Sequence, residues 1–128
     1  MSARRGARST RLRTKRVYEP ADDADGVRVL IDRLWPRGIA KAAARIDYWA
    51  RDVAPSTELR RWYEHDPDKW SAFRERYFAE LDANPDGVAA LRRALGAGPA
   101  TIVFSSKEER WNNATALVEY LARAKRRA

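Results

Sequence analysis

Two short runs of branched apolar residues, at 27–32 and 101–104, constrain the fold of this chain more than any other feature. Each run is bounded by turn residues and is typical of a buried β-strand. The sequence between them is mostly helical in pattern and far longer than a hairpin connection requires. The two strands are therefore expected to belong to an at least partly parallel sheet with helices packed on it.

The remaining segments extend this prediction along the chain. Residues 12–18 are predicted to form a first strand, and the short acidic loop that follows permits a hairpin with residues 27–32. Residues 41–45 are expected to form a helical turn, and residues 46–53 allow either a short strand or a helix. Ser56, Asp66, and Asn112 or Asn113 are suitable N-caps for later helices.

Aromatic residues mark the clearest helix. Trp70, Phe73, Tyr77 and Leu81 recur at three- and four-residue spacing, which predicts a helix over 69–81 with these side chains in the core. A shorter helix is expected at 88–95, after a break at 84–87. The predicted fold class is α/β: one small three-layer domain with a sheet of three or four strands flanked by helices.

Composition excludes several classes of site. At 128 residues the chain has room for one domain, and no apolar run approaches the roughly 20 residues of a membrane helix. It contains no cysteine and one histidine, His65. Disulfides, thiol nucleophiles, thiolate metal sites and multi-histidine metal sites are therefore excluded. No metal is expected, no cofactor is indicated, and His65 is interpreted as a cap or surface residue rather than an acid or base.

The net charge of +8 is concentrated at the two ends of the chain. Residues 1–16 contribute +7 and residues 123–128 contribute +4, so the body between them carries −3. We expect a disordered basic arm at 1–14, one domain at 15–122 and a basic tail at 123–128. The arm is either a solubilising extension or a nucleic-acid contact through phosphates. Its arginines are Arg4, Arg5, Arg8, Arg11 and Arg13. Without an apolar secretory signal, a cytoplasmic location is expected.

Polar clusters follow both central strands. Asp32, Arg33, Trp35 and Arg37 come after the first, and Ser105, Ser106 and Lys107 come after the second. If the strands are adjacent and parallel, both clusters lie at the carboxyl edge of the sheet, where open α/β sheets bind ligands. The last helix would begin beside them with free backbone N–H groups.

These residue types suit an anion. Arg33, Arg37 and Lys107 would hold it, and Trp35 would stack on or cover it. Hydrogen bonds would come from three further residues: Ser105, Asn112 and Asn113. Asp32 would orient an arginine or act as a general base. The alternative is purely architectural, with ion pairs and turns that only hold the loops.

The same residues resemble the domain-of-unknown-function family 488, specifically its small YeaO-like branch. The resemblance covers roughly residues 15–121. It rests on the segments 16–18, 28–38 (RVLIDRLWPRG) and 54–60 (APSTELR), and on Phe73, Arg74, Tyr77, Glu80, Leu81, Ser105, Ser106, Lys107, Asn112 and Asn113. It implies a compact cytosolic α/β protein and supplies no activity or cofactor.

Two departures from the family pattern limit what the resemblance transfers. Other members often have a histidine or another polar residue at the position of Trp111, so a mechanism with a base there does not carry over. Larger relatives have cysteines near the second polar loop, and rhodanese-like thiol chemistry is excluded in a chain without cysteine.

Three functional hypotheses follow. The first is binding of an anionic small molecule, phosphate-bearing or nucleotide-like, with turnover left open. The second is a nucleic-acid-binding accessory protein that uses the basic termini. The third is a protein-interaction module whose Trp35-Pro36-Arg37 loop contacts a partner.

Overall fold

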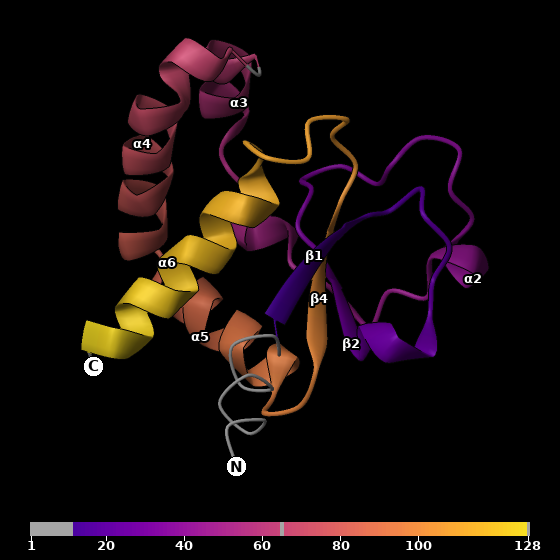
Figure 1. Cartoon of the computed structure of the whole chain (residues 1–128). Helices are drawn as coiled ribbons and strands as arrows, with labels where there is room; N and C mark the ends of the chain where they lie inside the picture. Colours follow the sequence, from indigo (N-terminus) through magenta and orange to yellow (C-terminus); the bar gives the residue numbers. More distant parts are fainter. Residues whose placement is uncertain (1–11, 65, 128) are drawn as a thin grey trace.

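A computed structural model of the protein describes residues 12–64 and 66–127, in which four strands form one parallel sheet (Figure 1). The strands are β1 (Leu12–Arg16), β2 (Val27–Leu30), β3 (Tyr48–Trp49) and β4 (Ala100–Phe104). Their spatial order is β1-β4-β2-β3. Val27 of β2 pairs with Ala100 of β4, so the two strands predicted from their apolar runs are parallel neighbours. The α/β class and the parallel sheet are confirmed.

The hairpin that the short loop permits between the first two strands does not form. Strand β4 lies between β1 and β2 and pairs with both in parallel. All five residues of β4 are buried, whereas β1 carries one exposed and four half-buried residues. An apolar strand without a polar face is more stable in the centre of a sheet. β4 therefore takes the central position, and β1 becomes an edge.

Four helices of the described chain pack with one face of the sheet to form the main core (Figure 1). They are α3 (Thr57–Tyr63), α4 (Trp70–Asp82), α5 (Pro85–Leu95) and α6 (Asn113–Arg127). The predicted aromatic stripe is confirmed on α4, where Phe73, Tyr77 and Leu81 are at most 2% exposed. The Tyr77 hydroxyl donates to the Val53 carbonyl at 2.6 Å.

The opposite face of the sheet has a thinner cover. Val17, Leu30 and Val103 pack there with Ala44 of α2 (Lys41–Ala44), which is a single turn as predicted. Four half-buried side chains complete the cluster: Trp35, Ile39, Ile46 and Trp49. The third layer is therefore mainly the connection between β2 and β3. The ambiguous segment 46–53 forms β3 and the 3-10 helix η2 (Arg51–Val53).

The predicted caps fix where the helices begin. The Ser56 hydroxyl accepts a hydrogen bond from the Leu59 N–H at the start of α3. Asn112 caps α6, because its Oδ1 accepts from the Thr115 N–H at 2.9 Å. Asp66 caps the 3-10 helix η3 (Pro67–Lys69). Helix α5 begins at Pro85, earlier than the expected residue 88, because the Asn84 side chain caps it.

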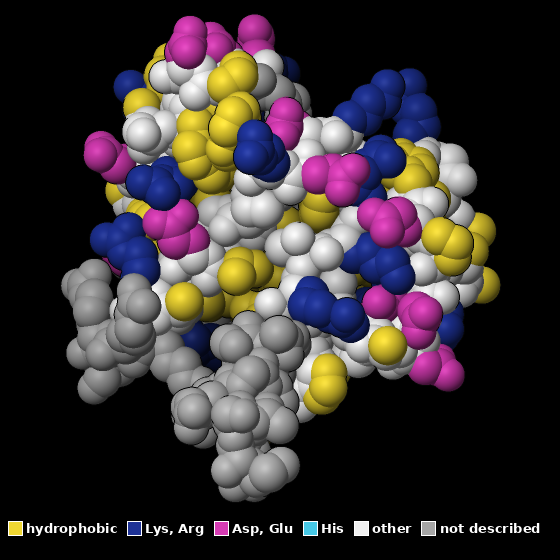
Figure 2. All heavy atoms as spheres, viewed as in Figure 1, with side chains coloured by type: hydrophobic (Ala, Val, Ile, Leu, Met, Phe, Trp, Pro, Cys, Tyr) yellow, Lys and Arg dark blue, Asp and Glu magenta, His cyan; other side chains and the backbone are white. Residues whose placement is uncertain are grey.

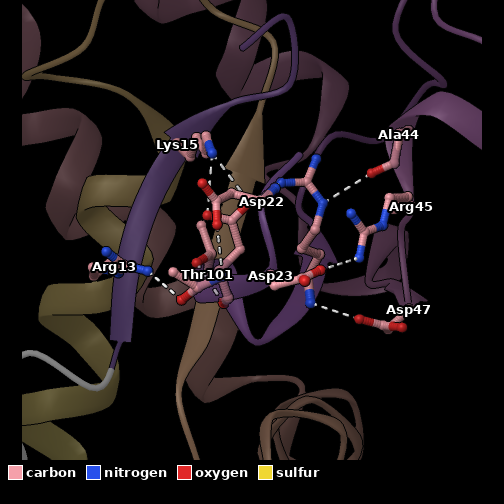
Figure 3. Close-up of polar contacts among 11 residues, drawn as sticks. Arg13, Lys15, Asp22, Asp23, Ala44, Arg45, Asp47 and Thr101 are labelled. Atoms are coloured by element: carbon pink, nitrogen blue, oxygen red, sulfur yellow. Dashed lines mark hydrogen bonds and ion pairs between the residues drawn. The ribbon is translucent and has the colours of Figure 1, made fainter. Parts of the chain in front are cut away.

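A buried charged cluster lies at the amino end of β2 and includes the last residue of the 3-10 helix η1 (Asp23–Asp25) (Figure 3). Asp25 is 4% exposed and accepts hydrogen bonds from Arg28 Nη1 at 2.6 Å and Lys15 Nζ at 3.1 Å. Burial raises the pKa of Asp25, but the Asp22 N–H and the two cations outweigh burial and hold this pKa below its usual range. The cluster ties η1 to β1 and β2.

The termini of the domain differ from the sequence-based boundaries. Leu12, Arg13 and Thr14 belong to β1, although the basic arm was expected to reach residue 14. Helix α6 runs to Arg127, so most of the expected tail continues this helix. Among the described residues, no helix has the length and apolar character needed to cross a membrane.

Candidate functional site

A cavity of about 410 Å³ opens at the carboxyl edge of the sheet. Its wall combines residues that follow β2, residues that follow β4, the first residue of α6, Phe73 of α4, and α3 with the Pro55 before it. Figure 1 shows the ends of these elements on the same side of the sheet. The two polar clusters expected to meet at this edge therefore do so through Asp32, Arg33, Ser105 and Ser106.

Asp32 is the least satisfied polar group of the cavity. The Asn113 amide donates to the Ile31 carbonyl at 2.9 Å and approaches Asp32 Oδ1 at only 3.4 Å. Asp32 Oδ2 is buried and has no hydrogen bond of regular geometry from the described residues. A buried polar atom without a partner is costly, and because Asp32 also lines the cavity, this oxygen is a candidate contact for a ligand donor or a water.

Electrostatics around Asp32 act in opposite directions. Burial is the largest influence and raises the pKa of the carboxyl group above its usual range. Contacts with the Ser105 hydroxyl and N–H, the Asn113 amide and the Arg60 charge each lower this pKa, without cancelling the effect of burial. The neighbours that oppose burial are hydrogen-bond donors or cations.

Two arginines of α3 line the cavity and were missed as site residues. Arg60 and Arg61 are exposed, and neither forms an ion pair with a described carboxylate. Arg60 is the last residue of the 54–60 segment that supported the family resemblance, and Arg61 follows it directly; this was the available signal. They lie on a helix and not directly after a strand, so a prediction based only on strand ends does not include them.

Arg33 lines the cavity but already has backbone partners. Its Nη2 donates to the Ala54 carbonyl at 2.8 Å, and its Nε donates to the Pro55 carbonyl at 3.3 Å. These bonds fix the segment before α3 against the loop after β2. Arg33 therefore positions the wall that carries Arg60 and Arg61, and it adds positive charge.

Three predicted contacts lie outside the cavity wall. The Trp35 indole donates to the Ile39 carbonyl at 2.7 Å and meets Trp49 edge-on at 5.5 Å, within the cluster on the opposite face of the sheet. Arg37 is exposed, and its carbonyl accepts from the Tyr18 hydroxyl. Lys107 is exposed and does not line the cavity. The chain turns to the other face immediately after Leu34, which separates Trp35 and Arg37 from Asp32.

The two asparagines have different positions. Asn113 lines the cavity, whereas Asn112 is 1% exposed and lies outside its wall. The Asn112 amide group donates to the Glu108 carbonyl at 2.7 Å while its oxygen caps α6. Asn112 thus holds the loop between β4 and α6 in the conformation that places Ser105 and Asn113 beside Asp32.

Aromatic rings form the apolar part of the wall. Tyr63 and Phe73 are stacked with ring centroids 4.4 Å apart, and both line the cavity. The Tyr63 hydroxyl donates to the Trp111 carbonyl at 2.8 Å. Burial, with Glu108 and Asp66 adding to it, raises the pKa of Tyr63 to about 12. Tyr63 therefore stays a neutral phenol at physiological pH.

Metal binding and nucleic-acid binding would need groups of which the described residues include only part. Among the described residues, no cluster of three His, Cys, Asp or Glu side chains could hold a metal ion. Of the basic-arm residues, Arg13 donates to the Ala24 carbonyl at 2.5 Å. Arg4, Arg5, Arg8, Arg11 and His65 lie outside the described residues. On the face drawn in Figure 2, described basic and acidic side chains are interspersed rather than gathered into one basic patch.

Comparison with known proteins gives consistent matches. The family model described as "Inactive DUF488-N3 subclade" matches residues 11–128. An uncharacterised protein of Mycobacterium tuberculosis is 43% identical over 114 residues, which cover 89% of this chain and 96% of the relative. The uncharacterised protein YeaO of Escherichia coli is 39% identical over 110 residues, covering 86% and 96% respectively. No solved structure matches the chain.

Proposed function

This chain belongs to the DUF488 family, in the subclade described as inactive, and we propose that it binds an anionic small molecule without transforming it. The ligand is phosphate-bearing or nucleotide-like and occupies the cavity at the carboxyl edge of the sheet. The description of the subclade as inactive supports binding without turnover. A cytoplasmic location, where phosphorylated metabolites are abundant, is part of the proposal.

The observation that carries this proposal is the pair Arg60 and Arg61 at the cavity. Two exposed guanidinium groups with no described carboxylate partner face a concave space lined by hydroxyl and amide groups. Guanidinium groups bind phosphate and carboxylate oxygens with strong, charge-assisted hydrogen bonds. The volume of about 410 Å³ lies within the usual range of small-molecule sites.

The remaining lining residues have supporting roles in this proposal. Ser105 and Asn113 supply hydrogen bonds, and Arg33 adds charge while it holds the α3 segment. Arg60 and Arg61 take the anion-binding role that the sequence suggested for Arg37 and Lys107, because the latter two lie outside the wall. Trp35 and Asn112 support the loops instead of contacting the ligand.

Binding assays on the full chain test the proposal. The probes are inorganic phosphate, ribose 5-phosphate and the four common nucleoside 5′-monophosphates, with melting temperature and calorimetric titration as readouts. A probe at about 100 times its Kd adds about 2.7 kcal/mol to stability. The double variant Arg60→Gln, Arg61→Gln should weaken binding about 10- to 100-fold by loss of charge-assisted hydrogen bonds.

The matched control is Arg93→Gln, an exposed arginine of α5 outside the cavity wall. It should leave the affinity unchanged. Binding that survives in the Arg60, Arg61 double variant, or no binding of any probe to the wild type, contradicts the proposal. In the second case, a parallel titration of DNA with and without residues 1–11 tests the nucleic-acid alternative through its salt dependence.

A further inference from the structure

The cavity is chemically divided, and this division restricts the kind of anion it can hold. Cationic groups lie on α3, whereas the Asp32 carboxyl group lies at the end of β2 between Ser105 and Asn113. Arg60 and Arg61 are exposed, while Asp32 Oδ2 is shielded from solvent. The ligand therefore meets two different environments, one at the mouth and one at depth.

A phosphate cannot occupy the deep end next to an ionised Asp32. Two negative charges in contact within a poorly solvated space repel each other strongly, and burial already disfavours the charged carboxylate. The favourable partner of Asp32 Oδ2 is a hydrogen-bond donor. The described neighbours of Asp32 are hydrogen-bond donors or cations, so none of them requires Asp32 to donate a hydrogen bond.

The apolar residues of the wall indicate the shape of the ligand group that donates to Asp32. Tyr63 and Phe73 are stacked together, and Pro55 and the 71% exposed Leu34 also contribute to the lining. A flat ring with apolar faces and a polar edge matches such a wall, because its faces lose water while its edge keeps a hydrogen bond. A base of a nucleotide has this combination, with an exocyclic amine or a ring N–H at its edge.

We propose that Asp32 determines the specificity of the cavity by accepting a hydrogen bond from the base of a nucleoside monophosphate, whose phosphate lies at Arg60 and Arg61. This inference rests on the proposed function and deepens it. The anion supplies affinity through the α3 arginines. The base edge supplies selectivity, because a ligand without a donor leaves the buried Oδ2 unpaired.

The variant Asp32→Asn provides the sharpest test. Ser105 and Asn113 donate toward the side chain, so they retain the amide oxygen and leave the amide NH₂ group at the position of Oδ2. This group faces the donor of the base and cannot accept from it. The nucleoside monophosphate that binds best should lose about 10- to 100-fold in affinity, the usual size for a hydrogen bond to a charged group.

Smaller probes separate the two halves of the ligand. Inorganic phosphate and ribose 5-phosphate lack the base, so Asp32→Asn should leave their affinity unchanged or improve it by removing a nearby negative charge. The near-isosteric Asp32→Leu, which has no polar end, should repeat this pattern if Asp32→Asn fails to fold. The matched control, Asp86→Asn in the exposed first turn of α5, should change neither affinity.

Each other result overturns the inference. An equal loss for the nucleotide and for ribose 5-phosphate removes the role of the base but leaves the Arg60 and Arg61 anion site intact. Tighter binding of phosphoethanolamine, which has an ammonium group and no ring, replaces the base with a small amine. A wild-type protein that binds phosphate but no nucleoside monophosphate also contradicts the inference, and failure of every probe contradicts the proposed function as well.

Discussion

The two ends of β2 each carry a buried or largely buried aspartate, and their surroundings are opposite. At the amino end, Asp25 contacts two cations and a backbone N–H, and its pKa is lowered. At the carboxyl end, Asp32 lies beside Ser105 and 3.4 Å from the Asn113 amide, its Oδ2 has no regular hydrogen bond from the described residues, and burial raises its pKa. The same side chain is thus satisfied by the fold at one end and left unsatisfied at the other.

This difference distinguishes a structural site from a functional one. In the Asp25 cluster the carboxylate is paired: Arg28 is 2% exposed, its Nη1 donates to Asp25 and its Nε to the Ala44 carbonyl, and only its Nη2 has no partner among the described residues. The Asp32 region is open, with a cavity instead of a partner. Protein folds tolerate an unsatisfied group of this kind mainly where a ligand or substrate completes it. Changes at the two aspartates should therefore have opposite consequences.

The largest expected effect is a loss of stability in Asp25→Ala. This change leaves Arg28 buried without its carboxylate, which typically costs about 3–5 kcal/mol. Urea denaturation of the full chain measures the change in the free energy of unfolding. The control is Asp23→Ala, because the Asp23–Arg45 ion pair is exposed and its loss should hardly change stability. Equal effects of the two changes would contradict the comparison.

The second expected effect concerns acid. Since the folded-state pKa of Asp25 lies below its unfolded value, its stabilisation is present above the unfolded value of about 3.9 and is lost as pH falls through the folded pKa. The wild type should therefore be more stable than Asp25→Asn at pH 7, and this advantage should shrink below about pH 4. Melting temperatures of both proteins across this range provide the measurement, and a constant difference would argue against the ion pairs as its source.

The smallest effect has the opposite sign. Because the folded-state pKa of Asp32 is raised, its contribution to stability is fully present below the unfolded pKa and is lost as pH rises through the folded pKa. Without ligand, Asp32→Asn should therefore be more stable than the wild type at pH 7, by about 1 kcal/mol, with the gain vanishing in acid. A destabilised variant at pH 7 would assign Asp32 a structural role like that of Asp25.

Much of the fold follows from local pattern. The branched apolar runs predicted β2 and β4, and the long helical segment between them predicted their parallel pairing, which the structure confirms. Ser56 was predicted as a cap and is one, and of the two asparagines predicted to cap the last helix, Asn112 does so. The hairpin was wrong because strand order depends on which strand buries both faces, and this is a competition among all strands rather than a property of one loop.

The sequence predicted cavity-lining residues that lie next to strand ends or at the start of α6, but not those on other helices. Asp32, Arg33 and Ser105 reach one cavity because parallel neighbours end at the same edge, and Asn113 joins them at the start of α6. Trp35 and Arg37 do not reach it, because a loop can leave a strand toward either face.

The sequence by itself determined the elements, their caps, the exclusion of cysteine chemistry and the presence of polar residues after two strands. These properties depend on residues close together in the chain. Only the tertiary structure decided that Arg60 and Arg61 line the same cavity as Asp32, and that Asp25 is paired with cations while Asp32 Oδ2 has no partner among the described residues. Those facts depend on packing between distant segments, which sets the burial, the partners and hence the pKa of each carboxyl group.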